Sequence, residues 1–368
     1  MASVQRACEE RLSSNGQKEC SDSCKHTIEI EDRYWHREIA LEDEIEKLVI
    51  EPGVDTNDNL PMSHKVELKD RSGHSILVNC VDGFYFHRGA TPRPFHQHLE
   101  DIRDMQLRPD DVFICAYPKS GTHWMWEIVS MVAHEDLVYR NHLERLNQPE
   151  FRSIRYLDSL TSPRVMSSHL HLRHLPRQIC ENRTKIILLR RNPKSVAVSY
   201  YHMTKGMKSV EGCEAGLVEV QDYDGQWDDY LQLFLDGEVP WGSWFDCLLD
   251  WETERKKHPE LQVLDLTFEE MKQNPVSTVL KVASFLGKEM TRQWAMSISE
   301  ACNFHNLKTR DANAATRCMD LTLKEGYGMY RKGETQEWKK WFSDAQNVRF
   351  SKMFATKMET SQYLREWS

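Results

Sequence analysis

The segment 112-VFICAYPKSGTHWMWEIVSMVA-133 constrains the fold more than any other part of the chain. A short apolar run ends at Tyr117-Pro118, a compact turn follows at 119–123, and apolar residues then recur at roughly helical spacing. This pattern predicts a strand, a glycine-bearing loop and a helix start. The first N–H groups of a helix have no partner inside it, and the helix dipole is positive there. Because Lys119 adds a positive charge, the segment predicts a site for a phosphate or a sulfate.

The composition is typical of a soluble globular protein. Of 368 residues, 40% are hydrophobic and 29% are charged, and the net charge of −9 argues against a general nucleic-acid binder. The longest apolar runs are far shorter than the ~20 residues of a membrane-spanning helix, and the first residues show no signal-peptide core. We therefore expect a cytoplasmic protein with no nucleic-acid or membrane partner. The ten cysteines are scattered and are expected to be buried thiols.

The chain is expected to have two parts. Residues 1–60 are polar and acidic, and we expect a largely flexible N-terminal extension with a short amphipathic helix at 33–50. Residues 61–368 are expected to form a single globular domain that carries the phosphate or sulfate site. This domain begins with two predicted strands, 65–70 and 75–81, which flank a Ser-Gly turn and indicate a hairpin.

Strands and helices alternate along the rest of this domain. The predicted strands are 111–116, 164–169, 185–190 and 261–266. Asn192-Pro193 is typical of a helix start, and the segment 275–287 begins at a proline and stops at a glycine. The alternation predicts an α/β fold with a central parallel sheet flanked by helices. In such sheets ligands bind beyond the carboxyl ends of the strands, where the Lys119 turn and Arg191 are expected to lie.

Two further segments offer groups for an anion. In 189-LRRNPKSVAVSYY-201, Arg191 closes a strand and Ser199 follows about two helical turns later, a pair that suits a phosphate. The segment 330-YRKGETQEW-338 offers two cations and a backbone amide, from Arg331, Lys332 and Gly333. No Walker A pattern is present, because the lysine of the first turn precedes its glycine, and an ATP-dependent kinase is therefore disfavoured.

The histidines and the N-terminal cysteines leave metal sites open as alternatives. His169 stands at the end of the predicted strand 164–169, and strand alternation would place His169 and His171 on one face, with His174 close behind. A zinc site there is conceivable, although the sequence near it supplies no cysteine or acidic ligand. A second alternative is the N-terminal group, whose spacing matches no zinc pattern: Cys8, Cys20, Cys24 and His26.

At this point the sequence resembles a known family. The motifs YPKSGT-x-W, RN-x-K-x-x-x-x-SYY and RKG-x-x-x-x-W, in this order and spacing, resemble the cytosolic sulfotransferases. These enzymes take a sulfuryl group from 3′-phosphoadenosine 5′-phosphosulfate (PAPS). The resemblance runs from about residue 64 to the C-terminus and includes the segments 110-DDVFICAYPKSGTHW-124, 242-GSWFDCLLDWE-252 and 269-EEMKQNP-275.

The resemblance implies a set of roles for the site residues. The 5′-phosphosulfate would lie on the P-loop-like turn of Lys119, Ser120, Gly121, Thr122 and His123. The 3′-phosphate would lie on Arg191, Ser199, Arg331, Lys332 and Gly333. The adenine would lie between Trp124 and Phe304, with Phe268 at the position of the family's adenine-contacting tyrosine. His169 would act as general base and Lys119 would stabilise the leaving group, with Ser120 beside it and no metal.

The sequence departs from the family at three places. Ser167-Ser168-His169 stands where many animal members have Lys-Thr-His, so we expect slower turnover or a shifted geometry. Gln336 replaces a glycine and is expected to alter its loop. The C-terminal dimerisation pattern is eroded at Ser343-Asp344 and Val348, so the usual homodimer is in doubt. A catalytically weak relative that only holds the nucleotide is therefore the alternative to an enzyme.

The acceptor is expected to be a small phenol, alcohol, steroid or amine. The segments expected to line its pocket are 84-FYF-86, 141-NHLERLNQPEF-151 and 205-KGMKSVEGCEAGLVEVQ-221. Their mixture of aromatic and polar residues selects none of these classes.

Overall fold

The computed structural model describes residues 63–87, 94–140, 147–207, 222–313, 324, 327–328 and 330–367. The chain divides into two units, 1–53 and 54–368, and every described residue belongs to the second. The N-terminal extension, its predicted helix at 33–50 and the cysteines of the N-terminal metal alternative lie outside the described residues. A domain boundary near residue 60 stays a prediction.

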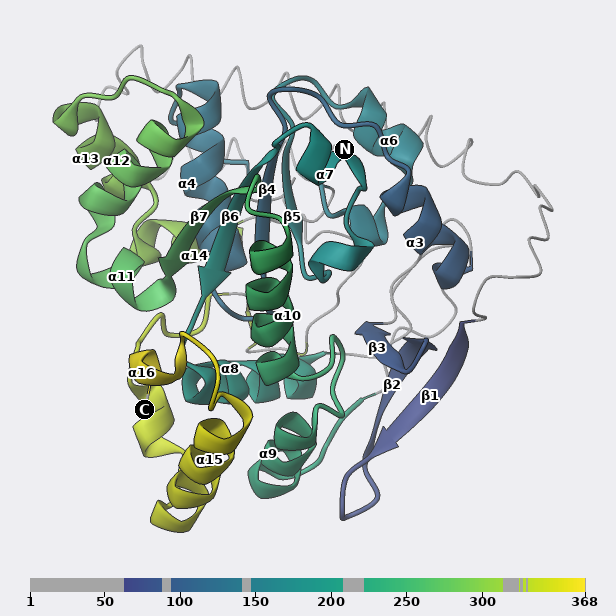
Figure 1. Cartoon of the computed structure of the whole chain (residues 1–368). Helices are drawn as coiled ribbons and strands as arrows, with labels where there is room; N and C mark the ends of the chain where they lie inside the picture. The colour runs from purple at the N-terminus through teal and green to yellow at the C-terminus, as the bar shows by residue number, and fades with distance from the viewer. Residues whose placement is uncertain are drawn as a thin grey trace, which may run out of the picture. The chain divides into compact units, whose positions relative to one another are not determined.

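The described strands form two sheets (Figure 1). An antiparallel sheet consists of β1 (His64–Lys69), β2 (Ser75–Val81) and β3 (Phe84–His87), which confirms the predicted hairpin and adds a strand where we expected an acceptor loop. The second sheet has four strands in the order β5-β4-β6-β7, and all its neighbours are parallel. Its members are β4 (Val112–Ala116), β5 (Val165–Ser168), β6 (Lys185–Arg190) and β7 (Gln262–Thr267). The predicted α/β class is confirmed.

Helices surround this parallel sheet. Before β6 they are α3 (Phe95–Arg103), α4 (Thr122–His134), η1 (Pro149–Phe151), α6 (Ile154–Ser159), η2 (Leu172–His174) and α7 (Gln178–Glu181). After β6 they are α8 (Pro193–Gly206), α9 (Trp227–Asp236), α10 (Trp244–Lys257), α11 (Phe268–Gln273), α12 (Pro275–Leu286), α13 (Arg292–Ala301), α14 (Phe304–Asn313), η3 (Glu337–Lys340), α15 (Asp344–Lys357) and α16 (Leu364–Trp367). None of these helices is long and apolar enough to cross a membrane.

The predicted helix ends are found where the sequence placed them. Asn192 caps α8 by accepting hydrogen bonds from the N–H groups of Lys194 and Ser195. Gly287 ends α12 with φ of +75°, a left-handed conformation that glycine adopts without steric cost. The Asn192 cap fixes where α8 begins after β6, and therefore the position of Arg191 between them.

The side chains of β4 alternate between two apolar layers. Val112, Ile114 and Ala116 pack in one core with α4, α12 and α13, which Figure 1 shows together on one side of the sheet. Phe113 and Cys115 pack in the other core. Successive side chains of a strand point to opposite faces, so an uninterrupted apolar run is what a strand covered on both faces requires.

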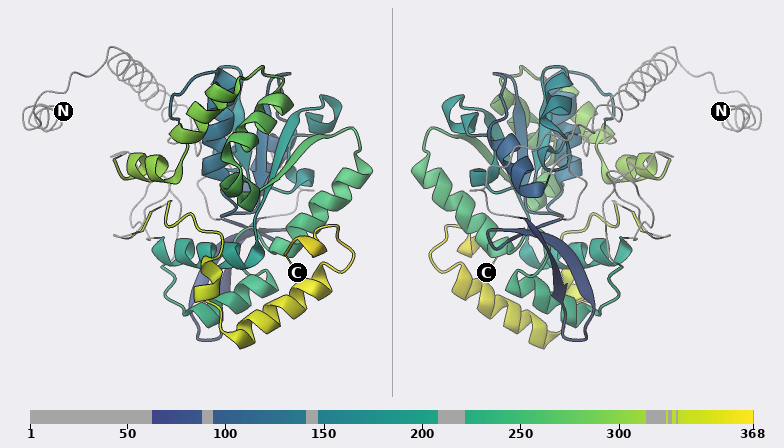
Figure 2. Two further views of the ribbon diagram at one scale, coloured as in Figure 1. Left: turned by 90° about the vertical axis from the view of Figure 1, so that its left-hand side faces the viewer. Right: turned by 90° about the vertical axis from the view of Figure 1, so that its right-hand side faces the viewer.

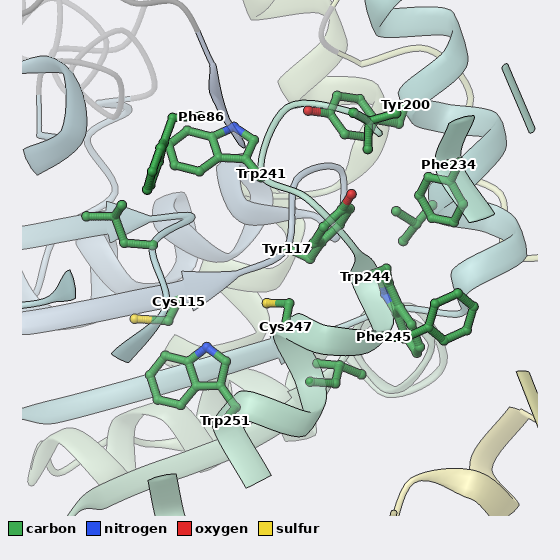
Figure 3. Close-up of a cluster of buried hydrophobic side chains, with 14 of the residues drawn as sticks. Phe86, Cys115, Tyr117, Tyr200, Phe234, Trp241, Trp244, Phe245, Cys247 and Trp251 are labelled. Atoms are coloured by element: carbon green, nitrogen blue, oxygen red, sulfur yellow. The ribbon is translucent and has the colours of Figure 1, made fainter. Parts of the chain in front are cut away.

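The second core is rich in aromatic side chains, and Figure 3 shows part of it. Tyr117 and Tyr200 use their hydroxyl groups there to donate to the backbone carbonyls of Gly242 and Pro240, at 2.7 and 2.9 Å. Figure 2 shows α15 beside α9, and its Phe350 stacks on Phe234. Since Tyr117 directly precedes the Lys119 turn, this core anchors the start of that turn.

The described cysteines are free thiols, as the sequence predicts. Four are buried and one is half-buried: Cys80, Cys115, Cys247 and Cys302, and then Cys180.

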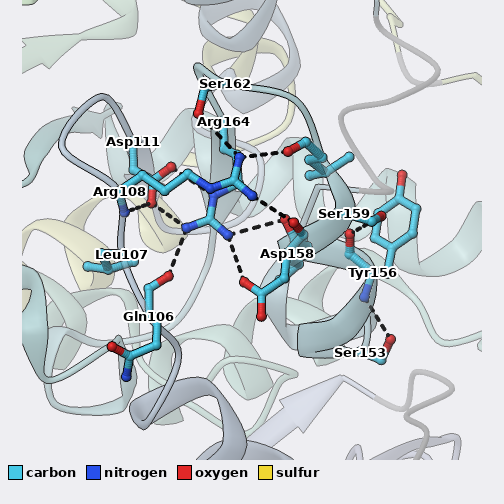
Figure 4. Close-up of polar contacts among 12 residues, drawn as sticks. Gln106, Leu107, Arg108, Asp111, Ser153, Tyr156, Asp158, Ser159, Ser162 and Arg164 are labelled. Atoms are coloured by element: carbon cyan, nitrogen blue, oxygen red, sulfur yellow. Dashed lines mark hydrogen bonds and ion pairs between the residues drawn. The ribbon is translucent and has the colours of Figure 1, made fainter.

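A buried ion pair joins the starts of two strands (Figure 4). The guanidinium of Arg164 donates to both carboxylate oxygens of Asp111, at 2.8 and 2.5 Å, and both side chains are fully buried. Asp111 immediately precedes β4 and Arg164 immediately precedes β5. A further bond from Arg164 to Asp158 at 3.0 Å ties in α6. The pair therefore fixes the relative position of two strands whose other ends carry the site.

Candidate active site

Four strand ends meet along one edge of the parallel sheet. In sheet order, β5 leads into His169, β4 into the Lys119 turn, β6 into Arg191 and β7 into Phe268. Parallel strands end at the same edge, so residues that are distant in sequence become neighbours there. The edge carries the groups that the sequence predicts for an anion and for proton transfer.

The backbone of the turn between β4 and α4 packs closely against its neighbours and leaves its N–H groups uncovered by a capping side chain. Lys119 and Gly121 both have left-handed backbone conformations, with φ of +68° and +105°. A Cβ atom on Gly121 would lie 2.7 Å from the Phe268 ring, so only glycine fits. Gly121 is also the N-cap of α4 and supplies no side-chain hydrogen bond to its first N–H groups. The hydroxyls of Ser120 and Thr122 are buried without a hydrogen-bond partner among the described residues. Such a helix start suits an anion with several oxygen atoms.

Arg191 links this turn to the C-terminal segment. Its Nη1 donates to the carbonyl of Lys119 at 2.9 Å and its Nη2 donates to the carbonyl of Glu334 at 3.1 Å. The guanidinium lies 4.1 Å from the centre of the Phe268 ring. Burial lowers the pKa of Arg191 to about 10, and nearby Glu269 opposes the shift, so the side chain stays charged at neutral pH.

The two cations of the segment 331-RKG-333 contact the same carboxylate, that of Glu337. Arg331 makes a two-pronged contact with Glu337, and Lys332 lies 2.9 Å from the same side chain. Burial alone would raise the pKa of Glu337, but its bonds to Arg331 and Lys332 lower it to about 2. Neighbouring Gln336 has φ of −117°, which suits any residue, so the strain expected from replacing a glycine there is not found.

His169 is held by its backbone and by its ring. Its N–H donates to Oε1 of Glu150 at 2.7 Å, and the Ser168 hydroxyl donates to Oε2 of the same fully buried carboxylate at 3.0 Å. The Nδ1 atom lies 2.8 Å from the carbonyl oxygen of Ala116. Because a carbonyl only accepts, Nδ1 carries the proton, and in the neutral ring Nε2 carries the lone pair.

All these segments line one cavity of about 180 Å³. Of the residues proposed from sequence, those in its wall are Lys119, Gly121, Thr122, His123, Trp124, His169, Arg191, Ser199, Phe268, Phe304, Arg331, Lys332 and Gly333. Ser120 is fully buried behind the wall. The Lys119 turn, Arg191 and Arg331 therefore line one space, although about 140 residues of sequence separate Arg191 from Arg331.

Comparison with known proteins identifies the family. The family model described as "Sulfotransferase domain" matches residues 109–362. The chain belongs to the sulfotransferase family. It is 31% identical to bovine sulfotransferase 1E1, over 73% of this chain and 90% of the relative. It is 30% identical to human sulfotransferase 1C2, over 81% of this chain and 95% of the relative.

Solved sulfotransferase structures have the same fold. Mouse sulfotransferase SULT7A1 complexed with PAP is 27% identical, with a TM-score of 0.60, over 79% of this chain and 99% of that one. A retinol dehydratase in complex with androsterone and PAP is 19% identical and has a TM-score of 0.62, over 78% of this chain and 91% of that one. The second likeness shows the fold alone. The recognition of a sulfotransferase, and so of a transferase enzyme, is confirmed.

Charged residues that the sequence did not point to also belong to the site of this sulfotransferase, among them Glu337. Lys272 lines the cavity, with its Nζ 6.0 Å from the centre of the Trp124 ring and 5.6 Å from that of Phe304. It stands in the family-like segment 269-EEMKQNP-275, which was the only available signal. Another is Glu150, whose hold on His169 depends on contacts that no spacing rule reveals.

Two sequence expectations are wrong. His169 and His171 do not share a strand face, because β5 ends at Ser168; His171 lies against Phe84, with its Nδ1 3.0 Å from Asp250. Residues 84–86 belong to β3 and are not among the residues of the cavity wall, whereas the other two predicted segments contribute Gln148, Phe151 and Met207 to it. The wall also includes His87, Met203 and Trp241. Residues 141–146 and 208–221 of the predicted acceptor loops lie outside the described residues.

Proposed function

We propose that this sulfotransferase transfers a sulfuryl group from PAPS to a hydroxyl or amine of a small acceptor. The observation that carries the proposal is the convergence of the Lys119 turn, the Arg191 and Arg331 guanidiniums and His169 on one cavity. PAPS has anionic groups at two positions of an adenine nucleoside, and the Lys119 turn together with the Arg191 and Arg331 guanidiniums offers cationic groups to both within one cavity. When bound, PAPS supplies an activated sulfuryl group whose S–O bond breaks as the acceptor oxygen or nitrogen attacks.

Different residues of this chain bind the two ends of PAPS. At one end, Lys119, Gly121, Thr122 and His123 hold the phosphosulfate, with the buried hydroxyls of Ser120 and Thr122 as further donors. Lys119 offsets the negative charge that develops on the leaving oxygen. At the other end, the 3′-phosphate binds Arg191, Ser199, Arg331, Lys332 and Gly333. Trp124 and Phe304 enclose the adenine, with Phe268 beside them.

His169 is the proposed general base. With Nδ1–H bonded to the Ala116 carbonyl, Nε2 is the atom that takes the proton from the acceptor. Glu150 holds the backbone at this point, which limits the movement of the ring. The proton moves onto Nε2 as the acceptor atom bonds to sulfur, and the bond between sulfur and the leaving oxygen breaks.

The acceptor side of the cavity combines aromatic, thioether and polar groups. Phe151, Trp241, Met203 and Met207 offer apolar contact, while Gln148 and His87 offer hydrogen bonds. This lining agrees with a small molecule that has an apolar body and one reacting hydroxyl or amine. Residence in the cytoplasm and the state of the homodimer remain predictions from the sequence.

One experiment tests the reaction. The full-length protein is incubated with labelled PAPS and a panel of phenols, aliphatic alcohols, steroids and amines, and binding of PAP is measured separately by calorimetry. We expect transfer to at least one class, with and without a chelator. His169→Asn is expected to lower kcat by about 10²–10⁴-fold while PAP affinity stays within threefold. His64→Asn, in exposed strand β1, serves as the matched control and should leave both unchanged.

The weak-enzyme alternative rests on Ser167. This fully buried hydroxyl accepts from the Gln148 amide at 3.1 Å, so a neutral pair stands where many animal relatives have a lysine. PAP binding without transfer to any of the four acceptor classes would favour this alternative. Loss of PAP binding in His169→Asn would show that the histidine is structural and would overturn its proposed role.

A further inference from the structure

A group of metal-binding side chains lies at the edge of the sheet opposite the cavity. The donor atoms of Cys180, His258 and Glu260 all lie within 4.8 Å of one another. Cys180 belongs to α7, which leads into β6, whereas His258 and Glu260 stand in the turn that joins α10 to β7. In Figure 1, α7 lies beyond the amino ends of the strands and α8 lies beyond their carboxyl ends. Two segments distant in sequence thus bring together a thiol, an imidazole and a carboxylate.

The His258 ring stands between two carboxylates. Its Nδ1 lies 3.0 Å from Oε1 of Glu260, and its Nε2 lies 3.8 Å from Oε2 of Glu254. Histidines that bind metals through one ring nitrogen usually direct the other N–H to a carboxylate, which fixes the ring. Oε2 of Glu254 would need to approach by somewhat less than about 1 Å to accept such a bond from Nε2, while Oε1 of Glu254 accepts from Lys257 at 2.7 Å.

The charges around the thiol favour a cation. Cys180 shares one hollow with the carboxylates of Glu181, Glu254 and Glu260. Three arginines also line this hollow, and two of them are engaged with other carboxylates: Arg173 with Asp250 at 2.6 Å and Arg177 with Glu100 at 2.7 Å. The third is Arg183. A divalent cation would relieve the repulsion between the carboxylates and a thiolate.

We propose that Cys180, His258 and Glu260 bind one Zn²⁺ ion, with a water molecule as fourth ligand. Sulfur, nitrogen and carboxylate oxygen are the donors that Zn²⁺ accepts in tetrahedral sites, whereas Mg²⁺ and Ca²⁺ require oxygen. Donor atoms around Zn²⁺ lie about 3.3–3.8 Å apart. A pair of donors near the 4.8 Å limit must therefore close by about 1 Å, whereas Nδ1 of His258 and Oε1 of Glu260, now 3.0 Å apart, must open slightly. Glu260 is 45% exposed and can make that movement. On binding, the Cys180 thiol loses its proton to solvent and its sulfur bonds to the metal.

The position of the ion gives it a structural role. It would connect α7 to the turn after α10, immediately before the neighbouring strands β6 and β7. These strands carry Arg191 and Phe268 at their far ends. The ion should therefore raise thermal stability and leave the turnover number unchanged, because it contacts no group of the cavity.

Cobalt spectroscopy tests the site directly in the full-length, metal-free, reduced protein. Co²⁺ is titrated in, and a thiolate-to-cobalt charge-transfer absorption is recorded and then displaced by Zn²⁺. We expect one equivalent with one thiolate, and a rise in the melting temperature of about 5 °C at a hundredfold excess of Zn²⁺ over its Kd. Cys180→Ser and His258→Gln should abolish the absorption, and Glu254→Gln should weaken affinity about tenfold.

Matched variants separate this site from the N-terminal cysteines. The triple variant Cys8→Ser/Cys20→Ser/Cys24→Ser should keep the absorption and the Zn²⁺ affinity of the wild type. Circular dichroism and PAP binding show that each variant is folded. The proposal is overturned if the wild type gives no thiolate absorption, or if the absorption survives in Cys180→Ser and disappears in the triple variant.

Discussion

The guanidinium of Arg191 bonds to the backbone carbonyl of Lys119 at 2.9 Å, so the two predicted anion-binding segments touch. The same guanidinium bonds to the carbonyl of Glu334 at 3.1 Å, in the segment that follows Gly333. One side chain thus spans the turn after β4, the end of β6 and the C-terminal loop. The relative position of the two ends of the nucleotide site depends on it.

Replacing Arg191 by lysine should therefore weaken PAP binding, although the positive charge is kept. A guanidinium has several N–H donors in one plane and can bond to both carbonyls and to a phosphate. The single compact ammonium group of lysine cannot bond to all three. We expect PAP affinity to fall by about 10- to 100-fold in Arg191→Lys, which corresponds to about 1.5–3 kcal/mol for hydrogen bonds to a charged group. Calorimetry with PAP measures this. An affinity within threefold of the wild type would contradict the linking role.

PAP binding is expected to require glycine at position 333, because of its backbone conformation and because the Phe304 ring leaves no room for a side chain. It has φ of +64°, and a Cβ atom there would lie 2.5 Å from the ring of Phe304. Gly333→Ala should displace Phe304 and so lower PAP affinity about tenfold. The left-handed backbone itself costs alanine roughly 1–2 kcal/mol of stability, whether or not PAP is bound. Gly73→Ala is the matched control, because Gly73 has φ of +89° with nothing near its Cβ position. If both variants bind PAP equally well, the contact with Phe304 has no role.

Lys272 is expected to contribute to binding of the adenine nucleotide. Its ammonium group lies near the rings of Trp124 and Phe304, and cation–ring contacts at exposed sites contribute about 0.5–1 kcal/mol. Lys272→Met should weaken PAP binding about two- to fivefold. Lys281→Met, on the exposed side of α12 and paired with Glu270, is the control. A response shared by both lysines would indicate only a general effect of charge.

Much of this site was predictable because its signals are local. The helix start at Asn192-Pro193, the glycine turn at 119–123 and the apolar strands all follow from short patterns, and parallel topology then brings their ends together. Lys272, Glu150 and the Glu337 contacts were not predictable, because they depend on side chains that meet only in three dimensions. The prediction for the segment 84–86 was wrong because its local signal is ambiguous. Its aromatic residues are typical of a binding loop and also of a strand.

The half-buried histidine His174 should make the fold sensitive to acid. Burial, and then the charge of Arg173, lower its pKa to about 3, so it is neutral in the folded protein above that pH. In the unfolded chain it takes up a proton near pH 6.5. Between these values the unfolded state binds more protons, so the free energy of unfolding falls as the pH falls, by up to about 1.4 kcal/mol per pH unit.

The comparison of wild type with His174→Gln isolates this effect. Urea unfolding between pH 6 and 4 should show a smaller loss of stability in the variant, because glutamine takes up no proton. The other groups near the ring are His171, Asp250 and Arg103, and they are unchanged in both proteins. Parallel pH profiles for the two proteins would rule out His174 as the source of acid sensitivity.

The pair Arg164 and Asp111 should be important for stability and not for chemistry. Both side chains are fully buried, so Arg164→Met leaves an unpaired carboxylate in the interior, which typically costs about 3–5 kcal/mol. The double variant Arg164→Met/Asp111→Asn removes the charge as well and should recover part of that loss. Denaturant unfolding measures both. Because the pair lies at the amino ends of β4 and β5, away from His169 and Lys119, kcat per folded molecule should match the wild type in both variants. An unfolding free energy of Arg164→Met within 1 kcal/mol of the wild type, as a rough limit, would show that water or a neighbouring group compensates Asp111.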